Sequence, residues 1–311
     1  MSVVLGGLSM ELRLHKYVFE GCGSIVYPQD LKTNRNPPTQ TDCMPNRSPL
    51  RYPGGKTRAL GLLDQYRSTY YPERSTLLSP FLGGGSFELA QADRGMRVYA
   101  NDLFAPLYWF WAVLKQDPRG LRAAVQAYRP VSKETFLTLR SSSLNFPDPQ
   151  QIAAAYFVVN RCSFSGATFC GGFSAEAAEK RCNDTALDRL LAVDLRSVTL
   201  SNQDAIDFLR AHPETTDTLI YADPPYFIPT YVYGKDGDMH EAFDHAGFAE
   251  CLRSRNDWIL SYNDCSYIRE LYMGCRIFQA AWSYGMNAEK ASSELIILPP
   301  EQSPEAGVPG P

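Results

Sequence analysis

The stretch "TLIYADPPYF", residues 218–227, ends an apolar, β-branched run with Asp223, Pro224, Pro225 and Tyr226. Two consecutive prolines lack backbone donors and cannot lie inside a buried strand, so we expect the strand to end at Asp223. Each proline also keeps the residue before it extended. The Asp223 carboxylate and the Pro224 carbonyl would then form a rigid pair of acceptors for an –NH2 group, and Tyr226 offers a flat face for a ring. The pattern indicates a pocket for a planar ring with an exocyclic amine; the alternative is a helix-capping aspartate before a Pro-Pro turn.

A glycine cluster lies in "SPFLGGGSFE", residues 79–88. A strand that runs into Gly83 to Gly85 and then a helix lets the backbone approach a ligand closely at the helix N-terminus. Asp102 follows Gly85 by seventeen residues, and in dinucleotide-binding sheets an acidic residue at about this distance accepts hydrogen bonds from ribose hydroxyls. The glycines match neither G-x-G-x-x-G nor the P-loop pattern. The spacing therefore favours a nucleoside-containing ligand without a tightly bound pyrophosphate, with a simple tight turn as the alternative.

A third stretch, "RYPGGK" (Arg51 to Lys56), places an aromatic residue, two glycines and a lysine just before an expected helix. It fits either a ligand-binding loop or a plain turn followed by a helix-capping lysine.

The elements around these stretches alternate between apolar strands and helices, which predicts an α/β fold with a doubly wound, mostly parallel sheet. The first expected helices are 57–71 and 85–95, and the first expected strands are 75–81 and 97–102. The alternation is lost from Phe104 to about Ser197, where 105–115, 118–129 and 149–161 have a helical period and 162–174 have none. We interpret this region as a mainly helical insertion, after which the alternation resumes. Residues 27–48 and those after Pro299 are predicted to be disordered.

Composition places the chain among ordinary globular proteins, with 311 residues, of which 44% are hydrophobic and 21% charged. It predicts neither a membrane span nor a signal peptide. Eight scattered cysteines form no C-x-x-C pair and predict reduced thiols and no metal site. The net charge of −4 does not indicate a general nucleic-acid binder. Basic residues are concentrated over 47–74 and 119–145, which fits solvated helix faces or phosphate contacts.

Taken together and in this order, "RYPGGK", "PFLGGGSFE", "AND" (residues 100–102) and "DPPY" resemble the Dam-type, D12 class of adenine-N6 DNA methyltransferases. "SYND" (261–264) and "SSELIIL" also match landmarks of that family, and the cofactor motif before "DPPY" is its alpha arrangement. The resemblance covers residues 48–299. It implies a Rossmann-like methyltransferase domain formed by 48–103 and 198–299, a target-recognition insertion at 104–197, an N-terminal extension at 1–47 and a disordered tail at 300–311.

The resemblance also implies roles for individual residues. The amine pocket and catalysis would use Asp223, Pro224, Pro225 and Tyr226. S-adenosylmethionine would be bound by Tyr52, Lys56, Phe81, Gly83, Gly85, Asp102, Asp204 and Asp223, with Asp207 as the alternative to Asp204. "NRCSFSG" (160–166) matches a family segment that makes Arg161 and Phe164 candidates for DNA binding, and Arg129 and Lys133 are candidate phosphate contacts. The hairpin expected to follow, 167–180, is acidic and differs from that of the GATC readers, so the GATC target is not transferred.

The function implied is site-specific transfer of a methyl group from S-adenosylmethionine to N6 of a flipped adenine in double-stranded DNA, without a metal. A cognate restriction endonuclease is a further expected partner, and the expected location is the cytoplasm of a bacterium or archaeon, or of a cell infected by a virus. One alternative is methylation of another planar amine, such as cytosine N4, an RNA base or a protein glutamine. Another is a DNA-binding module without activity, which the intact glycine cluster, Asp102 and "DPPY" argue against.

Overall fold

The computed structural model describes residues 46–142, 146–227, 243–283 and 291–301, all of which belong to one compact unit, 44–311. The predicted N-terminal extension up to residue 45 and the tail from residue 302 lie outside the described residues. Within the described ranges, none of the helices is long and apolar enough to cross a membrane.

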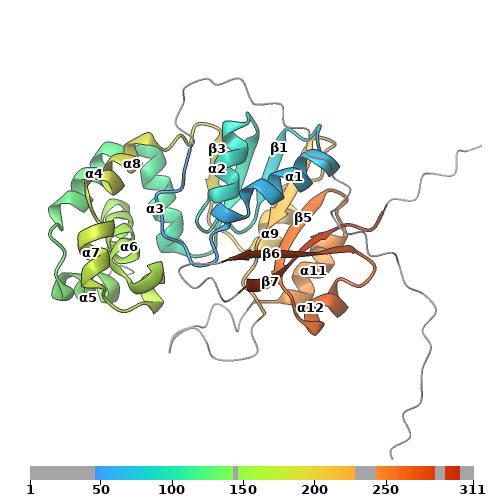
Figure 1. Cartoon of the computed structure of the whole chain (residues 1–311). Helices are drawn as coiled ribbons and strands as arrows, with labels where there is room; N and C mark the ends of the chain where they lie inside the picture. Colours follow the sequence, from blue (N-terminus) through green and yellow to red (C-terminus); the bar gives the residue numbers. More distant parts are fainter. Residues whose placement is uncertain (1–45, 143–145, 228–242, 284–290, 302–311) are drawn as a thin grey trace, which may run out of the picture. The chain divides into compact units, whose positions relative to one another are not determined.

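Seven strands form one mixed sheet with the order β3-β2-β1-β4-β5-β7-β6 (Figure 1). All neighbours are parallel except β7, which is antiparallel to both β5 and β6. The strands are β1 (Thr76–Ser79), β2 (Arg97–Asn101), β3 (Val198–Ser201), β4 (Thr218–Ala222), β5 (Trp258–Asn263), β6 (Arg276–Ser283) and β7 (Ala291–Leu298). The strand order reverses between β1 and β4, and in such sheets ligands bind at the carboxyl ends of the strands beside this point. The predicted doubly wound, mostly parallel sheet is confirmed.

The α-helices within the described residues connect these strands or belong to the insertion. Those of the sheet region are α1 (Leu60–Tyr70), α2 (Ser86–Asp93), α9 (Ala205–Ala211), α11 (His245–Arg253) and α12 (Ser266–Leu271). Those between β2 and β3 are α3 (Ala105–Gln116), α4 (Pro118–Ala127), α5 (Lys133–Ser142), α6 (Pro149–Cys162), α7 (Ala175–Arg181) and α8 (Asp184–Ala192).

The two faces of the sheet belong to two separate apolar clusters, as the period-two alternation of side chains requires. Leu77 and Tyr221 point to the face covered by α1 and α2, and Leu78 and Ile220 point to the face covered by α9, α11 and α12. Both clusters are nearly free of exposed surface, and burying each such side chain contributes roughly 1.5–3 kcal/mol. The sheet is therefore a rigid base for the loops at its carboxyl edge.

The insertion is built around α6, of which every residue from Ala153 to Cys162 is buried. Helix α6 packs against α3, α4, α5 and α7. Its apolar side chains, Phe157 among them, belong to the same cluster as Leu77 of the sheet. The insertion is thus helical, as expected, but its core is continuous with one face of the sheet.

The hairpin predicted over 167–180 is wrong. The stretch forms a short 3-10 helix, η5 (Thr168–Cys170), followed by α7. Ser174 caps α7 by accepting a hydrogen bond from the Ala177 N–H at 3.2 Å. Glu176 in the first turn and Lys180 in the last then complement the helix dipole. These local preferences for a helix prevail over the expected turn.

Candidate active site

The carboxyl ends of β1, β2 and β3 are joined by one buried amide. The Asn101 side chain donates to the carbonyl oxygens of Pro80 (3.1 Å) and Gln203 (2.9 Å) and accepts from the Gln203 N–H (2.9 Å). Asn101 has no exposed surface, and losing such a partner would leave buried polar groups unsatisfied at about 1–3 kcal/mol each. This amide fixes the spacing of the loops that follow the three strands.

The turn after β1 uses glycine where another residue would not fit. Gly83 has φ +50° and Gly85 has φ +65°, values that favour glycine. A Cβ atom on Gly83 would lie 3.0 Å from Cε1 of Tyr52, and one on Gly85 would lie 3.0 Å from Cζ2 of Trp111. The Trp111 indole also donates to the Gly83 carbonyl at 3.1 Å. An aromatic ring from each side therefore shapes the turn before α2, and Tyr52 stays 38% exposed above it.

Asp102 is tied to this turn by its carboxylate. One oxygen accepts from the Gly83 N–H at 2.9 Å and the other from the Phe104 N–H at 3.0 Å. Burial raises the pKa of Asp102 to about 6, although the two N–H donors oppose the rise. A carboxylate has about four acceptor sites, so Asp102 can still accept from hydroxyl groups of a ligand.

Asp223 follows β4 directly and meets the amino group of Lys56. The Lys56 Nζ lies 2.7 Å from Oδ1 of Asp223, 2.9 Å from the Tyr226 hydroxyl and 3.1 Å from the Gly54 carbonyl. Burial raises the pKa of Asp223 and the charge of Lys56 opposes that rise. The carboxylate is thus kept at the sheet's switch point by a cation that is only 4% exposed.

The rest of "DPPY" is oriented by packing and by one amide. Among the described residues, no hydrogen-bond donor reaches the carbonyl of Pro224. The Asn263 side chain donates to the Phe227 carbonyl at 2.8 Å, and the Tyr226 ring lies 6.2 Å from that of Tyr262. A carboxylate, an acceptor carbonyl and a ring thus follow β4 in this order, and the arrangement suits an amine on a planar ring.

A family model for the D12 class of N6 adenine-specific DNA methyltransferases matches residues 52–286. The chain belongs to this family. It is therefore an S-adenosylmethionine-dependent enzyme that methylates adenine in DNA at N6. A comparison with curated proteins finds no significant match.

The residues at the switch point of this methyltransferase fit S-adenosylmethionine. Gly83 and Gly85, both with positive φ, form a tight turn at the start of α2, and Asp102 has acceptor sites left for ribose hydroxyls. Within the described part of the chain, no cluster of three His, Cys, Asp or Glu side chains is placed to hold a metal ion.

Two further cofactor candidates, Asp204 and Phe81, already make contacts within the protein. Asp204 is exposed after β3 and caps α9, accepting from the N–H groups of Ile206 at 2.8 Å and Asp207 at 3.3 Å. Phe81 is half-buried and packs edge-on against Phe248, with ring centroids 5.1 Å apart. Both residues follow strands at the carboxyl edge of the sheet, where a cofactor is expected. No contact in the structure tests their roles, which stay predictions.

Three residues of this site were not predicted. Trp111 comes from a stretch that looks only helical and apolar, and Asn101 lies next to the predicted Asp102 without a pattern of its own. Glu88 ends the glycine motif but is 3% exposed. It accepts from the Ser79 hydroxyl at 2.7 Å, and burial raises its pKa to about 7. A glutamate at the third position of a helix is ordinarily a surface residue, so only the fold reveals its burial.

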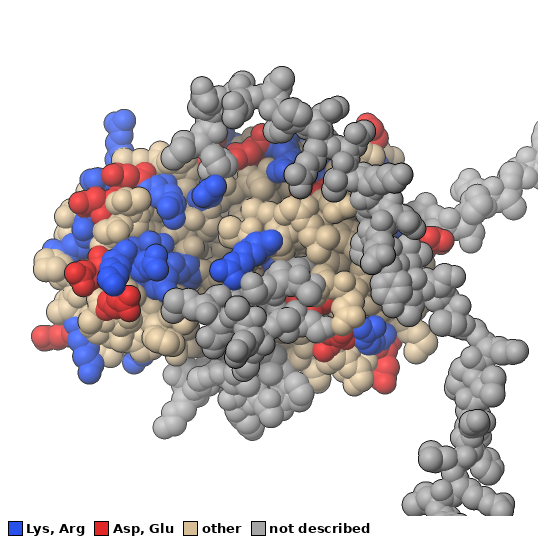
Figure 2. Space-filling view, in the orientation of Figure 1, with Lys and Arg blue, Asp and Glu red and all other residues tan. Residues whose placement is uncertain are grey.

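The candidates for DNA binding differ in their surroundings. Figure 2 shows Lys and Arg side chains gathered over the helices of the insertion on one face of the molecule. Lys133 is exposed and makes no ion pair within the described ranges, whereas Arg129 is paired with Asp184 at 2.5 Å. Phe164 is 66% exposed. It precedes Ser165, whose φ of +53° is rare for a residue with a side chain.

Arg161, the other candidate of the "NRCSFSG" segment, is buried. Its side chain is 7% exposed and donates to the carbonyls of Arg181 at 2.6 Å and Pro49 at 3.2 Å. Helix α6 is buried along this part of its length, so the role of Arg161 as a DNA-side residue stays a prediction. In this structure Arg161 connects the segment before Tyr52 to the end of α7.

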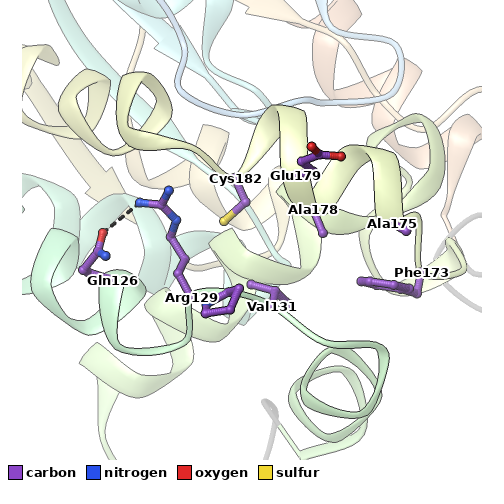
Figure 3. A pocket seen from close by; sticks show the side chains of 9 residues that line it. Gln126, Arg129, Val131, Phe173, Ala175, Ala178, Glu179 and Cys182 are labelled. Carbon is purple, nitrogen blue, oxygen red and sulfur yellow. Dashed lines mark hydrogen bonds between the residues drawn. The ribbon is translucent and has the colours of Figure 1, made fainter.

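A pocket of about 490 Å³ lies within the insertion, away from the motif residues (Figure 3). Its lining includes Phe173, Val131, Cys182 and Arg129, and the Arg129 guanidinium donates to the Gln126 side chain at 2.8 Å. None of the residues predicted to bind the cofactor or the amine lines it. We therefore assign the chemistry to the switch point of the sheet and not to this pocket.

Proposed function

We propose that this methyltransferase binds the adenine amine with Asp223 and the Pro224 carbonyl, and that it acts at a specific sequence in double-stranded DNA. The observation that carries the proposal is the position of the Asp223 carboxylate, which follows β4 at the switch point and is paired with Lys56 at 2.7 Å. Pro224 and Pro225 fix the backbone of this pair of acceptors.

The two acceptors would activate a poor nucleophile. The lone pair of adenine N6 is delocalised into the ring, so the planar amine attacks weakly. Hydrogen bonds from its two hydrogens to Asp223 and Pro224 favour a pyramidal nitrogen whose lone pair is directed outward. Positioning of this kind supplies much of the rate of a direct displacement.

S-adenosylmethionine supplies a methyl group on a positively charged sulfur, which leaves as a neutral thioether without the help of a metal. Asp102 would accept from the ribose hydroxyls, and the turn at Gly83 and Gly85 would lie against the methionine part. Tyr52, Phe81 and Asp204 would border the same ligand. Lys56 would act on both the cofactor and the adenine amine, since it follows the "RYPGG" loop and contacts Asp223.

The target adenine has to leave the double helix before it can reach Asp223. Flipping a base costs a few kcal/mol, and the flat face of Tyr226 would contribute part of that free energy by stacking on the flipped base. The Tyr226 hydroxyl is fixed by Lys56 at 2.9 Å, so the ring is already oriented before the base arrives.

The insertion, 104–197, would be the target-recognition domain. Phe164 and Lys133 are exposed on it, and Arg129 would turn from Asp184 to a phosphate. An enzyme of this kind would act in the compartment that contains the DNA, which is the cytoplasm for a bacterial, archaeal or phage-encoded protein. A restriction endonuclease of the same specificity would be its functional partner.

Mass spectrometry of nucleosides tests the proposal. DNA incubated with S-adenosylmethionine and the protein is expected to contain N6-methyladenine, and DNA incubated with Asp223→Ala is expected to contain none. Because Asp223 would act mainly on the amine, the variant should still bind S-adenosylmethionine in a calorimetric titration. Sequencing of the methylated DNA then gives the target. Turnover retained by Asp223→Ala would overturn the role of Asp223, and a methylated cytosine would overturn the choice of amine.

A further inference from the structure

A strongly basic pocket of about 350 Å³ lies where the segment before Tyr52 meets the end of α7 and the start of α8. Among the residues that the structure describes, no acidic side chain lines it. Its lining includes five cationic residues, Arg51, Arg161, Lys180, Arg181 and Arg189. A concentration of positive charge without acidic neighbours in the lining is the arrangement expected of an anion site.

The arginines of this pocket act on one another. The pKa of Arg161 falls to about 10, chiefly through burial and then through the charges of Arg51, Arg189 and Arg181. The pKa of Arg51 is lowered by burial and by Arg181. Like charges kept this close destabilise one another, and an anion bound between them would relieve the repulsion.

The exposed arginines of the pocket also lack acidic partners. Among the described residues, the side chains of Arg181 and Arg189 make no ion pair and no hydrogen bond. Neighbouring basic residues are neutralised, as Arg122 is by Asp188 at 3.0 Å and Lys180 by Glu176 at 3.2 Å. Two guanidinium groups are therefore available to a ligand beside two that are partly buried.

The backbone adds to the positive potential. Helix α8 begins at the pocket, where Asn183 caps it by accepting from the Ala186 N–H at 3.0 Å, and both residues line the pocket. The N-terminus of a helix carries partial positive charge and free N–H donors that suit an anion. Arginine side chains add planar, paired donors that match phosphate oxygens.

The pocket is connected to both functional segments of the chain. The Asn160 amide donates to the Arg51 carbonyl at 2.8 Å and accepts from the Arg51 N–H at 2.9 Å. The Arg51 guanidinium donates to the carbonyl of Ser163 at 3.1 Å, just before the exposed Phe164. Tyr52, which lies over the Gly83 turn, follows Arg51 directly. A phosphate bound here would lie beside the DNA-facing loop and one residue from the cofactor loop.

We propose that this pocket binds a backbone phosphate of the DNA substrate through Arg181 and Arg189, with Arg51 and Arg161 beneath them. The proposal rests on the proposed function. Such a contact carries no sequence information but fixes the position of the duplex relative to the amine pocket.

Salt-dependent binding tests the pocket without requiring methyl transfer. The dissociation constant for a duplex is measured between 50 and 300 mM KCl with S-adenosylhomocysteine bound. Each phosphate contact contributes a slope of about 0.9 in log Kd against log salt. We expect Arg181→Gln and Arg189→Gln each to lower the slope by about 1 and to weaken binding roughly ten-fold at low salt. The matched control is Arg210→Gln, which removes the same charge from an exposed arginine on α9. Slopes and dissociation constants equal to those of the wild type would overturn the proposal.

Two further arms identify the source of the phosphate and separate the two proposals. One neutral methylphosphonate is placed at successive positions of the duplex backbone. At one position it should weaken binding by the wild type, and at that position it should not weaken binding by Arg189→Gln any further. If inorganic phosphate stabilises the wild type but not Arg189→Gln, while the methylphosphonate scan is flat, the site takes a free anion and the DNA contact is excluded. If adenine is methylated but both variants bind DNA normally, the pocket proposal fails alone. If the two variants lower the salt slope of log Kd but no adenine is methylated, the proposed function fails and the pocket proposal stands.

Discussion

Lys56 contacts the residues of "DPPY", which its expected role as a cofactor ligand does not include. The sequence places it with the cofactor ligands, but its amino group contacts Asp223 at 2.7 Å and the Tyr226 hydroxyl at 2.9 Å. The charge of Lys56 lowers the pKa of Asp223, against the effect of burial. Lys56 therefore favours the ionised form of Asp223, the form that would accept a hydrogen bond from the amine, whereas burial favours the protonated form.

Lys56→Gln should act on the chemical step. Without the cation the pKa of Asp223 rises, so the acidic limb of the kcat profile moves to higher pH. At pH 8 we expect kcat to fall about ten- to a hundred-fold, as the loss of a charged hydrogen bond of about 1.5–3 kcal/mol implies. The measurement is kcat and KM for S-adenosylmethionine from pH 5.5 to 9.

Arg210→Gln serves as the control for charge loss and should keep the wild-type profile. If Lys56→Gln instead raised only the KM for S-adenosylmethionine and left the acidic limb in place, Lys56 would be a cofactor ligand, as the sequence alone implies.

Glu88 should give the fold a dependence on pH of its own. Burial raises its pKa from an ordinary value of 4.5 to about 7. The folded chain then holds a proton that the unfolded chain releases, so the stabilisation is complete below pH 4.5 and is lost as pH rises through 7. The loss amounts to about 3 kcal/mol of unfolding free energy. Glu88→Gln keeps the shape without the charge, so relative to the wild type its free energy of unfolding should gain about 2.5 kcal/mol between pH 5 and pH 8, as measured by urea unfolding.

Glu134→Gln, at an exposed position of α5, is the control and should shift the unfolding free energy by less than about 0.5 kcal/mol at either pH. A difference between Glu88→Gln and the wild type that stays constant with pH would mean that Glu88 is already ionised in the folded protein.

At the scale of elements, α3 couples the insertion to the Gly83–Gly85 turn through Trp111. Its indole donates to the Gly83 carbonyl at 3.1 Å and lies against Gly85. Trp111→Phe removes the hydrogen bond and part of the ring. A hydrogen bond is worth about 1 kcal/mol net, so we expect the affinity for S-adenosylmethionine to fall about five-fold, as measured by calorimetric titration.

Trp258→Phe is a matched control for this change. Trp258 is fully buried, and its indole donates to a backbone carbonyl, that of Arg255, at 3.1 Å. Trp258 is the first residue of β5, so it lies at the amino ends of the parallel strands, whereas the Gly83–Gly85 turn lies at their carboxyl ends. Both variants should lose similar stability, but only Trp111→Phe should lose cofactor affinity. Equal affinities would show that α3 does not support the turn.

The elements that position the site could largely be predicted from the sequence because their signals are local. The expected strand at 97–102 matches β2, and the expected helix at 85–95 contains α2. Gly83 and Gly85 have the positive φ that a strand-to-helix glycine turn requires. The hairpin at 167–180 was wrong because it relied on a family pattern, whereas Ser174 and the alanines after it favour α7.

At the scale of the whole molecule, prediction fails where residues distant in sequence meet. Lys56 and Tyr226 are 170 positions apart, and no periodicity or spacing indicates that they touch. Arg161 lies in a matching motif, but only the packing of α6 against its neighbours shows that its side chain is buried. Burial and long-range contacts are properties of the assembled core, which local sequence does not encode.

The same core makes the insertion part of a single cooperative unit. Phe157 of α6 is fully buried and stacks on Phe110 of α3, with ring centroids 5.8 Å apart and an interplanar angle of 8°. Both rings belong to the apolar cluster that contains Leu77 of β1. An insertion with a core of its own could unfold alone, but one that shares its core should not.

Phe157→Ala tests this cooperativity by hydrogen exchange. Deleting a buried phenylalanine costs about 3–5 kcal/mol, and because the cluster is shared, the slowest amides of α6 and of β1 should lose protection by the same free energy. Phe248→Ala, in the cluster on the opposite face of the sheet, is the companion variant. It should also lower the protection of the slowest amides of α6 and of β1 by equal amounts. Loss of protection in α6 with β1 unchanged would mean that 104–197 unfolds independently, and the insertion would then be a domain in the thermodynamic sense. Equal losses would mean that the helices of the insertion and the residues at the switch point are ordered together, so that a phosphate bound at Arg189 would stabilise the fold around Asp223 too.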